Sequence, residues 1–397
     1  MDMFVRQQYS ILKERLEEPR KFIQVVSGPR QVGKSTLVTQ VMNDVTVPYD
    51  MENADGIDAT DGAWIGRVWQ SVRMTMQLRQ EPEHILVIDE VQKLNNWSEI
   101  VKREWDYDTL HGINIKVILL GSSRLLIRKG LTESLAGRYE LIRIGHWSFA
   151  EMNTAFGYSL EQYIYYGGYP GPASMINDER RWKRYIKDSL VAPAIKKDVI
   201  MTSNIYKPAL MKQVFELGCA YSSELLSLSK MVGQLQDAGN VTTIANYIDI
   251  LRQCELLCGL QKYSVDNARK YNSVPKFQVF NNALLTAYKG RSFEKDCTDT
   301  KVWGRWVESA VGAHLISRAD ELGYSVYYWR ERNDEVDFVV TCQDKCYAIE
   351  VKSGRRSMNS GLPAFNVKFS PTSAFVVGTQ GVSLYDFLTS DLENLFG

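Results

Sequence analysis

Long apolar runs are missing from this sequence, because no segment reaches the roughly 18 uncharged apolar residues that a bilayer span needs. Residues 1–6 also lack the apolar stretch of a signal peptide. We therefore expect a cytoplasmic protein without a membrane partner. An excess of charge is missing too, since 47 basic residues balance 47 acidic ones. Bulk charge thus argues neither for nor against nucleic acid, although a local basic patch can still attract it.

Cysteine pairs of the C-x-x-C kind are absent among the six cysteines. Cys254 and Cys258 are one turn apart in a predicted helix, and Cys342 and Cys346 flank a predicted turn between strands. Neither spacing fits a common zinc pattern. We interpret the cysteines as reduced core residues, with a zinc site as the alternative.

The 397 residues are enough for two or three domains at roughly 150 residues each. Four regions differ in their pattern of apolar and charged residues. Residues 1–155 alternate apolar strands with amphipathic helices, which is typical of a parallel sheet covered on both faces. Residues 156–200 look helical and basic. Residues 201–290 hold helices and a strand pair, and residues 291–397 hold a helix and then strands. The sequence thus predicts a multidomain α/β fold. The predicted strands are 22–26, 85–88, 117–120, 141–144, 260–264, 275–280, 326–329, 336–340, 347–351 and 374–377, and a helix is predicted over 302–318.

Residues 28–35 spell the phosphate-loop pattern G-x-x-x-x-G-K-[ST], with a predicted strand before it and a predicted helix after it. Glycines let successive backbone N–H groups turn inward around an anion, and the helix N-terminus adds positive charge. Lys34 would reach the β- and γ-phosphates, and the Ser35 hydroxyl would bind Mg²⁺. ATP and Mg²⁺ are therefore the predicted cofactors. The predicted nucleotide-binding residues are Gly28, Pro29, Arg30, Gln31, Val32, Gly33, Lys34, Ser35 and Thr36.

Two carboxylates follow the apolar strand at 85–88, at the end where parallel sheets place ligands. Asp89 would hold the magnesium shell. Glu90 would act as general base toward the attacking water. The alternative is a pair of helix-capping acids.

Polar residues also follow the strand at 117–120. Ser122 or Ser123 would lie beside the γ-phosphate, a position that resembles the sensor-1 element of AAA+ ATPases. Arg138 precedes the strand at 141–144, where it would neutralise transition-state charge in its own subunit or across a subunit interface. A surface salt bridge is the alternative for Arg138.

The C-terminal region carries a second set of charged residues. Glu350 and Lys352 share one face of a predicted strand, and Asp337 joins them if its strand pairs alongside. Glu308, on the preceding helix, is a fourth candidate. Asp337, Glu350 and Glu308 would bind Mg²⁺, and Lys352 would activate water or steady the phosphate in phosphodiester hydrolysis. The alternative is an exposed strand face of paired charges.

The order GPRQVGKST, ILVIDEVQ, LLGSSR, SLAGRYELIRIGHWSFAEM, YYGGYP and the C-terminal E-V-D-F resembles a prokaryotic family of AAA+/STAND-like P-loop ATPases with a C-terminal PD-(D/E)xK nuclease-like domain. The resemblance implies an ATPase core over 1–155 and a helical lid over 156–200. It also implies a winged-helix domain over 201–290 and a restriction-endonuclease-like domain over 291–397. The run at 145–149 and the valine before Asp337 depart from the family pattern.

The resemblance further implies that Gly168 and Pro170 lie near the nucleotide. It places a helix-turn-helix at 225–235 and 242–256, although the second helix has only Arg252 as a cation, which makes it a poor groove reader. The implied function is Mg²⁺-dependent ATP hydrolysis that drives or switches the nuclease-like domain on DNA or RNA. A homo-oligomer is a candidate assembly. The alternative is a nucleotide-switched regulator or scaffold whose nuclease-like domain is inactive.

Overall fold

The computed structural model divides into two compact units, residues 1–145 and residues 146–397, which are described separately. Among the helices of the described residues, none has the length and apolar character needed to cross a membrane. The structure describes residues 4–121, 130–131, 134–196, 205, 207–236, 239–265, 273–354, 361–379 and 381–396.

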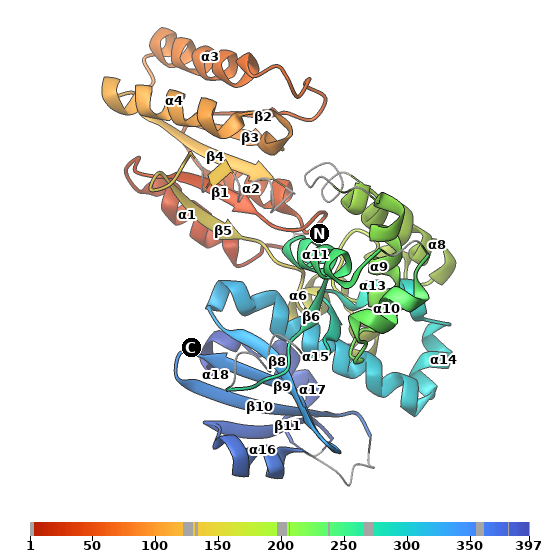
Figure 1. The fold of residues 1–397 in the computed structure, drawn as a ribbon. Coiled ribbons are helices and arrows are strands. Elements are labelled where there is room, and N and C mark those ends of the chain that lie inside the picture. The colour runs from red at the N-terminus through yellow and green to blue at the C-terminus, as the bar shows by residue number, and fades with distance from the viewer. Residues whose placement is uncertain are drawn as a thin grey trace. The chain divides into compact units, whose positions relative to one another are not determined.

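The first unit is built on a parallel sheet of five strands in the order β2-β3-β4-β1-β5 (Figure 1). Every residue of β1, β3 and β4 is buried, as expected of central strands covered on both faces. The predicted parallel α/β sheet is therefore confirmed. The strands are β1 (Ile23–Ser27), β2 (Tyr49–Asn53), β3 (His84–Asp89), β4 (Ile115–Gly121) and β5 (Tyr139–Arg143), and the helices are α1 (Gln8–Glu17), α2 (Lys34–Asp44), α3 (Ala63–Arg79) and α4 (Trp97–His111).

Helices α3 and α4 share an apolar core with one face of the sheet, where Val25 contributes from β1. They are also joined by Asp108, which is fully buried. Its two carboxylate oxygens accept hydrogen bonds from Trp69 Nε1 and Arg73 Nε, both at 2.7 Å. On the opposite face, Arg15 of α1 donates to Gln24 of β1 at 3.1 Å. Alternate residues of β1 thus face different helices.

The second unit contains helices, a two-stranded sheet and a four-stranded sheet in the order β11-β10-β9-β8. In the four-stranded sheet β10 pairs parallel with β11 and antiparallel with β9. The helices are α6 (Phe149–Phe156), α7 (Leu160–Tyr166), α8 (Glu179–Arg184), α9 (Pro208–Ala220), α10 (Leu228–Gln234), α11 (Val241–Gln253), α13 (Asn282–Lys289), α14 (Phe293–Thr298), α15 (Thr300–Leu322), α16 (Leu362–Phe369), α17 (Leu384–Thr389) and α18 (Leu392–Phe396). The strands are β6 (Leu257–Leu260), β7 (Lys276–Val279), β8 (Ser325–Glu331), β9 (Asp334–Cys342), β10 (Lys345–Lys352) and β11 (Ser373–Gly378).

Strand β6 corrects one prediction, since it ends at Leu260, where a strand was expected to begin. The predicted helix before it also ends earlier, at Gln253. Cys254 therefore caps α11 while Cys258 lies in β6, so the two thiols do not share a helix face. All six cysteines are free.

Buried polar side chains connect distant parts of the second unit. The amide of Asn282 on α13 donates to the carbonyls of Ile164, at 2.7 Å, and Trp306, at 2.9 Å. A single side chain thus links α7, α13 and α15. Because an unpaired buried amide or carbonyl is costly, this link favours one arrangement of the three helices.

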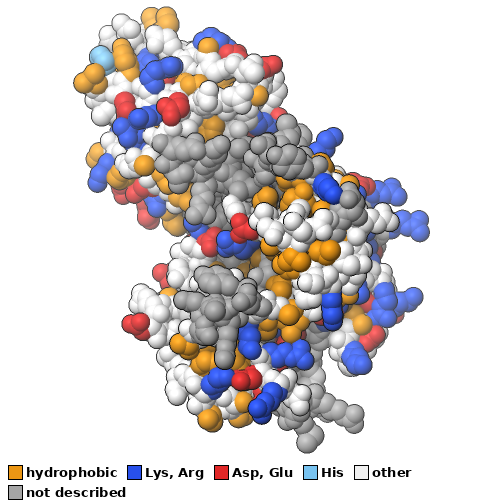
Figure 2. All heavy atoms as spheres, in the orientation of Figure 1, with side chains coloured by type: hydrophobic (Ala, Val, Ile, Leu, Met, Phe, Trp, Pro, Cys, Tyr) orange, Lys and Arg blue, Asp and Glu red, His pale blue; other side chains and the backbone are white. Residues whose placement is uncertain are grey.

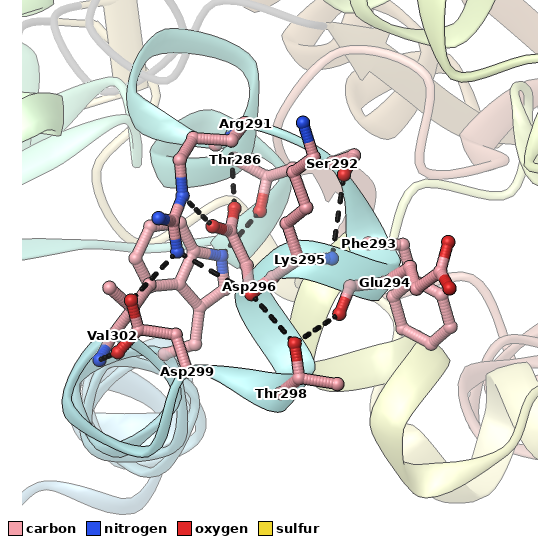
Figure 3. A network of polar contacts seen from close by, with 12 residues as sticks. Thr286, Arg291, Ser292, Phe293, Glu294, Lys295, Asp296, Thr298, Asp299 and Val302 are labelled. Carbon is pink, nitrogen blue, oxygen red and sulfur yellow. Dashed lines mark hydrogen bonds and ion pairs between the residues drawn. The ribbon is translucent and has the colours of Figure 1, made fainter.

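The junction of α13, α14 and α15 is held by a second polar network (Figure 3). Arg291 donates to Asp296 at 2.6 Å and to Asp299 at 3.1 Å. Asp299 also caps α15 by accepting from the Val302 N–H at 3.2 Å. The segments before and after α14 are therefore joined by two carboxylates that bind one guanidinium.

Candidate functional site

The loop at residues 28–33 leaves β1 and enters α2 through two glycines that the backbone requires. A Cβ on Gly28 would lie 1.9 Å from the Ile144 carbonyl oxygen, so the loop passes directly against the chain that continues β5. Gly33 has φ +92°, a left-handed conformation that favours glycine. As the N-cap of α2, Gly33 has no side chain that caps the first turn. This end of α2 thus has the form of an anion site.

Lys34 is the first residue of α2 and only 7% exposed. Its ammonium donates to the carbonyls of Gly28, at 3.0 Å, and Pro29, at 2.7 Å. The charge therefore lies over the loop, where phosphate oxygens would replace the two carbonyls as acceptors.

The next residue brings the loop together with β3. Ser35 Oγ donates to Asp89 Oδ2 at 2.7 Å. The other oxygen of Asp89 accepts from the Glu90 N–H at 2.8 Å. A hydroxyl and a carboxylate at the carboxyl end of parallel strands are oxygen ligands of the kind Mg²⁺ takes together with phosphate, so these residues fit the ion. Thr36 follows in the same turn of α2.

Glu90 lies in a left-handed turn, φ 55°, directly after β3. Its Oε2 accepts from Gln92 Nε2 at 2.8 Å and lies 3.7 Å from the Lys93 ammonium. Lys93 also pairs with Asp55. Gln92 is 6% exposed and was not singled out from the sequence. Its place two residues after Glu90 was the feature of the sequence that could have pointed to it.

Arg138 lies at the amino end of β5, because the Ile23 N–H at the start of β1 donates to its carbonyl at 2.8 Å. The phosphate loop leaves the other end of β1, roughly 16 Å away for five residues of strand. The Arg138 guanidinium binds the Asp106 carboxylate at 2.7 and 3.1 Å. This contact is a salt bridge, the alternative that the sequence offered to a role at the nucleotide. This position does not suit charge neutralisation in its own subunit. Ser122 and Ser123 lie outside the described residues.

The glycine pair of the YYGGYP segment has a packing role inside the second unit. A Cβ on Gly168 would lie 2.0 Å from the Trp147 carbonyl oxygen, and one on Gly167 would lie 2.0 Å from Asn281 Oδ1. The Gly168 N–H also donates to that Asn281 oxygen at 3.1 Å. A place for Gly168 and Pro170 beside the nucleotide stays a prediction.

Three of the four charged residues predicted in the C-terminal region make short contacts within the paired strands β9 and β10. Asp337 of β9 accepts from the Val351 N–H of β10 at 2.8 Å, which fixes its carboxylate beside that strand. Lys352 and Glu350 form an ion pair at 2.5 Å. Burial, and then the Asp337 charge, raise the pKa of Glu350 to about 7 against the pull of Lys352.

A fifth member, Lys276 of β7, was missed from the sequence. It is 1% exposed, and its ammonium lies 2.5 Å from Glu308 Oε1, 3.7 Å from Asp337 Oδ1 and 3.8 Å from Glu335 Oε1. Burial alone would lower the pKa of Lys276, but these carboxylates hold it above its usual value. Lys276 is therefore charged. Among the described residues, no three His, Cys, Asp or Glu side chains are grouped to hold a metal ion.

Comparisons with known proteins match three segments of the chain to families. A family described as an AAA domain matches residues 20–153. Families described as domains of unknown function match residues 157–295 (DUF8612) and 303–386 (DUF4143). Residues 20–153 therefore carry an AAA-type domain of the P-loop ATPase class, with a parallel α/β sheet that matches it.

Several curated relatives are described only as uncharacterized proteins. One from Haemophilus influenzae is 23% identical over 349 residues, covering 83% of this chain and 82% of its own. One from Mycobacterium tuberculosis is 23% identical over 351 residues, with 85% and 73% covered. One from Methanocaldococcus jannaschii is 23% identical over 368 residues, with 85% and 77% covered. Among solved structures, Thermotoga maritima RuvB aligns with 64% of this chain and 90% of its own at 13% identity and a TM-score of 0.35.

Proposed function

We propose that the first unit hydrolyses ATP with Mg²⁺. The hydrogen bond between Ser35 and Asp89, next to the buried ammonium of Lys34, is the observation that carries this proposal. Lys34 would bind the β- and γ-phosphates, while Ser35 and Asp89 would hold the ion, which neutralises charge on the phosphate oxygens. Glu90 would accept a proton from the water that attacks the γ-phosphorus. The bond to the β–γ bridging oxygen then breaks, and its electron pair leaves with ADP.

Two substitutions separate binding from turnover. Lys34→Ala should abolish binding of a fluorescent ATP analogue, because it removes the ammonium that would bind the phosphates. Glu90→Gln should keep that binding but stop phosphate release. Glu18→Gln, an exposed acid after α1, serves as the control and should change neither measurement. Normal phosphate release by Glu90→Gln would remove the general-base assignment.

We further propose that the second unit comprises a helical lid, a winged-helix-like segment and a nuclease-like domain that the ATPase drives or switches. Helices α10 and α11 followed by the hairpin β6–β7 support the winged-helix interpretation. Helix α15 and the sheet that carries Asp337, Glu350 and Lys352 support the nuclease-like interpretation. Lys and Arg side chains gather along the edge that carries α8 and α14 in Figure 2, which favours DNA or RNA as a partner.

The rival proposal is a nucleotide-switched regulator or scaffold with an inactive nuclease-like domain. Lys276 favours it, because an ammonium already lies among the carboxylates. An assay with Mg²⁺ or Mn²⁺ and varied DNA and RNA, with and without ATP, decides between the two. Cleavage that Asp337→Ala abolishes supports a nuclease, and absence of cleavage supports the regulator. DNA affinity that falls steeply with rising salt would separately support a nucleic-acid partner.

We also propose a cytoplasmic homo-oligomer in which Arg138 acts on the nucleotide of a neighbouring subunit. Its position away from its own phosphate loop supports this assignment. A mixture of Arg138→Ala and Glu90→Gln chains should then recover part of the ATPase activity that each lacks alone, because a mixed interface combines an intact Glu90 with an intact Arg138. A mixture without any recovery would contradict action in trans.

A further inference from the structure

The charged cluster of the second unit is assembled from separate segments of the chain. Glu308 comes from α15, Asp337 from β9 and Glu350 from β10. Lys276 comes from β7, a strand of a different sheet, and reaches into the cluster. The Lys276 ammonium lies inside the protein, because the side chain is only 1% exposed.

The ammonium of Lys276 lies between Glu308 of α15 and Asp337 of β9, two of the carboxylates that would hold a divalent ion. It lies 2.5 Å from Glu308 Oε1 and 3.7 Å from Asp337 Oδ1, and it donates to the Asp337 carbonyl at 3.2 Å. It also lies 5.0 Å from the centre of the Phe338 ring, so an apolar side chain closes one side. An ammonium and a divalent ion would compete for these oxygens, because their positive charges repel each other at such short range.

Glu350, the third carboxylate of the cluster, also lies beside a lysine of the chain. Lys352 pairs with Glu350 Oε1 at 2.5 Å. Asp337 Oδ2 is occupied by the Val351 N–H at 2.8 Å. Glu308 Oε1 and both oxygens of Asp337 therefore each lie against a partner from the chain, whereas Glu350 Oε2 is buried without a hydrogen-bond partner. This agrees with the absence of a metal-holding group of His, Cys, Asp and Glu among the described residues.

We propose that Lys276 supplies the cation of this carboxylate cluster, so that Glu308 and Asp337 do not take up a divalent metal ion. The cluster is then a closed ion-pair site that joins β7 to α15 and β9. A cluster closed in this way favours the regulator with an inactive nuclease-like domain over the nuclease, and this inference does not depend on ATP hydrolysis by the first unit. Its failure is therefore distinguishable from failure of the ATPase proposal, which the Glu90→Gln measurements decide.

The test measures Mn²⁺ binding to the full chain without nucleotide, using the electron paramagnetic resonance signal of free Mn²⁺. Comparison with Asp337→Asn isolates this cluster from any other ion on the protein. The wild type should bind as many Mn²⁺ ions as Asp337→Asn. Lys276→Met should bind one more, because its removal frees the Glu308 and Asp337 oxygens, and Mn²⁺ should also raise the Tm of this variant. One Mn²⁺ in the wild type that Asp337→Asn loses would overturn the proposal.

A paired variant controls for the charge left behind. Lys276→Met leaves buried carboxylates without a counterion, which is destabilising. Lys276→Met combined with Glu308→Gln removes the ammonium together with its nearest carboxylate and should recover part of the lost Tm, but without the additional Mn²⁺. A folded Lys276→Met chain that gains no ion would contradict the proposal. If circular dichroism shows Lys276→Met unfolded even with Mn²⁺, the comparison of wild type with Asp337→Asn decides alone.

Discussion

Replacing Gly28 by alanine tests whether the phosphate loop owes its shape to close backbone packing. The added Cβ would lie 1.9 Å from the Ile144 carbonyl oxygen and 2.9 Å from its carbon. Real Cβ contacts essentially never fall below about 3 Å, so the two segments would have to separate by roughly 1 Å. That movement would strain the bond from the Ile144 N–H to the Ser27 carbonyl, now 2.9 Å long. The perturbation thus acts on backbone that cannot rotate away.

The expected loss can be estimated from these two effects. Overpacking a tight site costs about 1–3 kcal/mol, and a weakened hydrogen bond adds about 1 kcal/mol. Gly28→Ala should therefore lower the free energy of unfolding by about 2–4 kcal/mol. It should also weaken ATP binding, because the loop N–H groups lose their common direction.

Two further glycines provide matched comparisons, since a Cβ on either would meet nothing within 4 Å. Gly33 has φ +92° and lies in the loop, whereas Gly112 has φ +66° and follows α4. Both alanine variants should lose about 1–2 kcal/mol from the left-handed backbone alone. Only Gly33→Ala should also weaken binding of the ATP analogue.

Chemical denaturation and analogue titration measure both quantities on the same samples. Wild-type stability together with wild-type affinity in Gly28→Ala would refute the packing argument. An equal loss of affinity in Gly112→Ala would show that binding follows general stability and not the loop. Gly28→Ala with lowered stability but unchanged affinity would refute the link between loop shape and binding.

Three other outcomes are expected. Gln92→Leu should lower kcat for ATP about tenfold or more with little change in KM, because Glu90 loses a charge-assisted hydrogen bond; steady-state kinetics measure this. Burial, and then the Arg318 charge, lower the pKa of His314 to about 4 in the folded protein. As the pH falls, His314 is therefore protonated in the unfolded chain before it is protonated in the folded one. Stability should thus fall on the order of 3 kcal/mol between pH 6.5 and 4, and His314→Phe should flatten that dependence in denaturation series. Asp108→Ala should destabilise the protein by about 2–4 kcal/mol in urea, because it leaves the buried Trp69 indole N–H without its acceptor and removes one of the two carboxylates that Arg73 binds.

The sequence was most informative where local pattern and function coincide. The phosphate loop and strands β1, β3 and β4 could be predicted because central parallel strands form short apolar runs. Strand β2 was missed, since this edge strand is mostly exposed and has only two apolar residues, Tyr49 and Met51, in a short run. Its place in the sheet depends on pairing with β3, and this pairing cannot be predicted from the residues of β2 alone.

Lys276 shows a second limit of sequence reasoning. A lysine at the start of a predicted strand indicates an exposed position, because lysine is almost never fully buried unless paired. Its partners Glu308, Glu335 and Asp337 lie on other elements, and only the tertiary fold brings them near. Arg138 is similar, because a salt bridge was weighed from the sequence but its partner, Asp106 of α4, was not identified.

The link made by Asn282 has a consequence for how this protein changes over evolutionary time. Ile164 and Asn282 fall in the segment matched by one family and Trp306 in the segment matched by another, yet they share one side-chain amide. Residues 146–397 also form one compact unit. A recombination event between residues 295 and 303 would separate the Asn282 amide from one of its two acceptors. We therefore expect the C-terminal sheet to be inherited together with the helices that precede it.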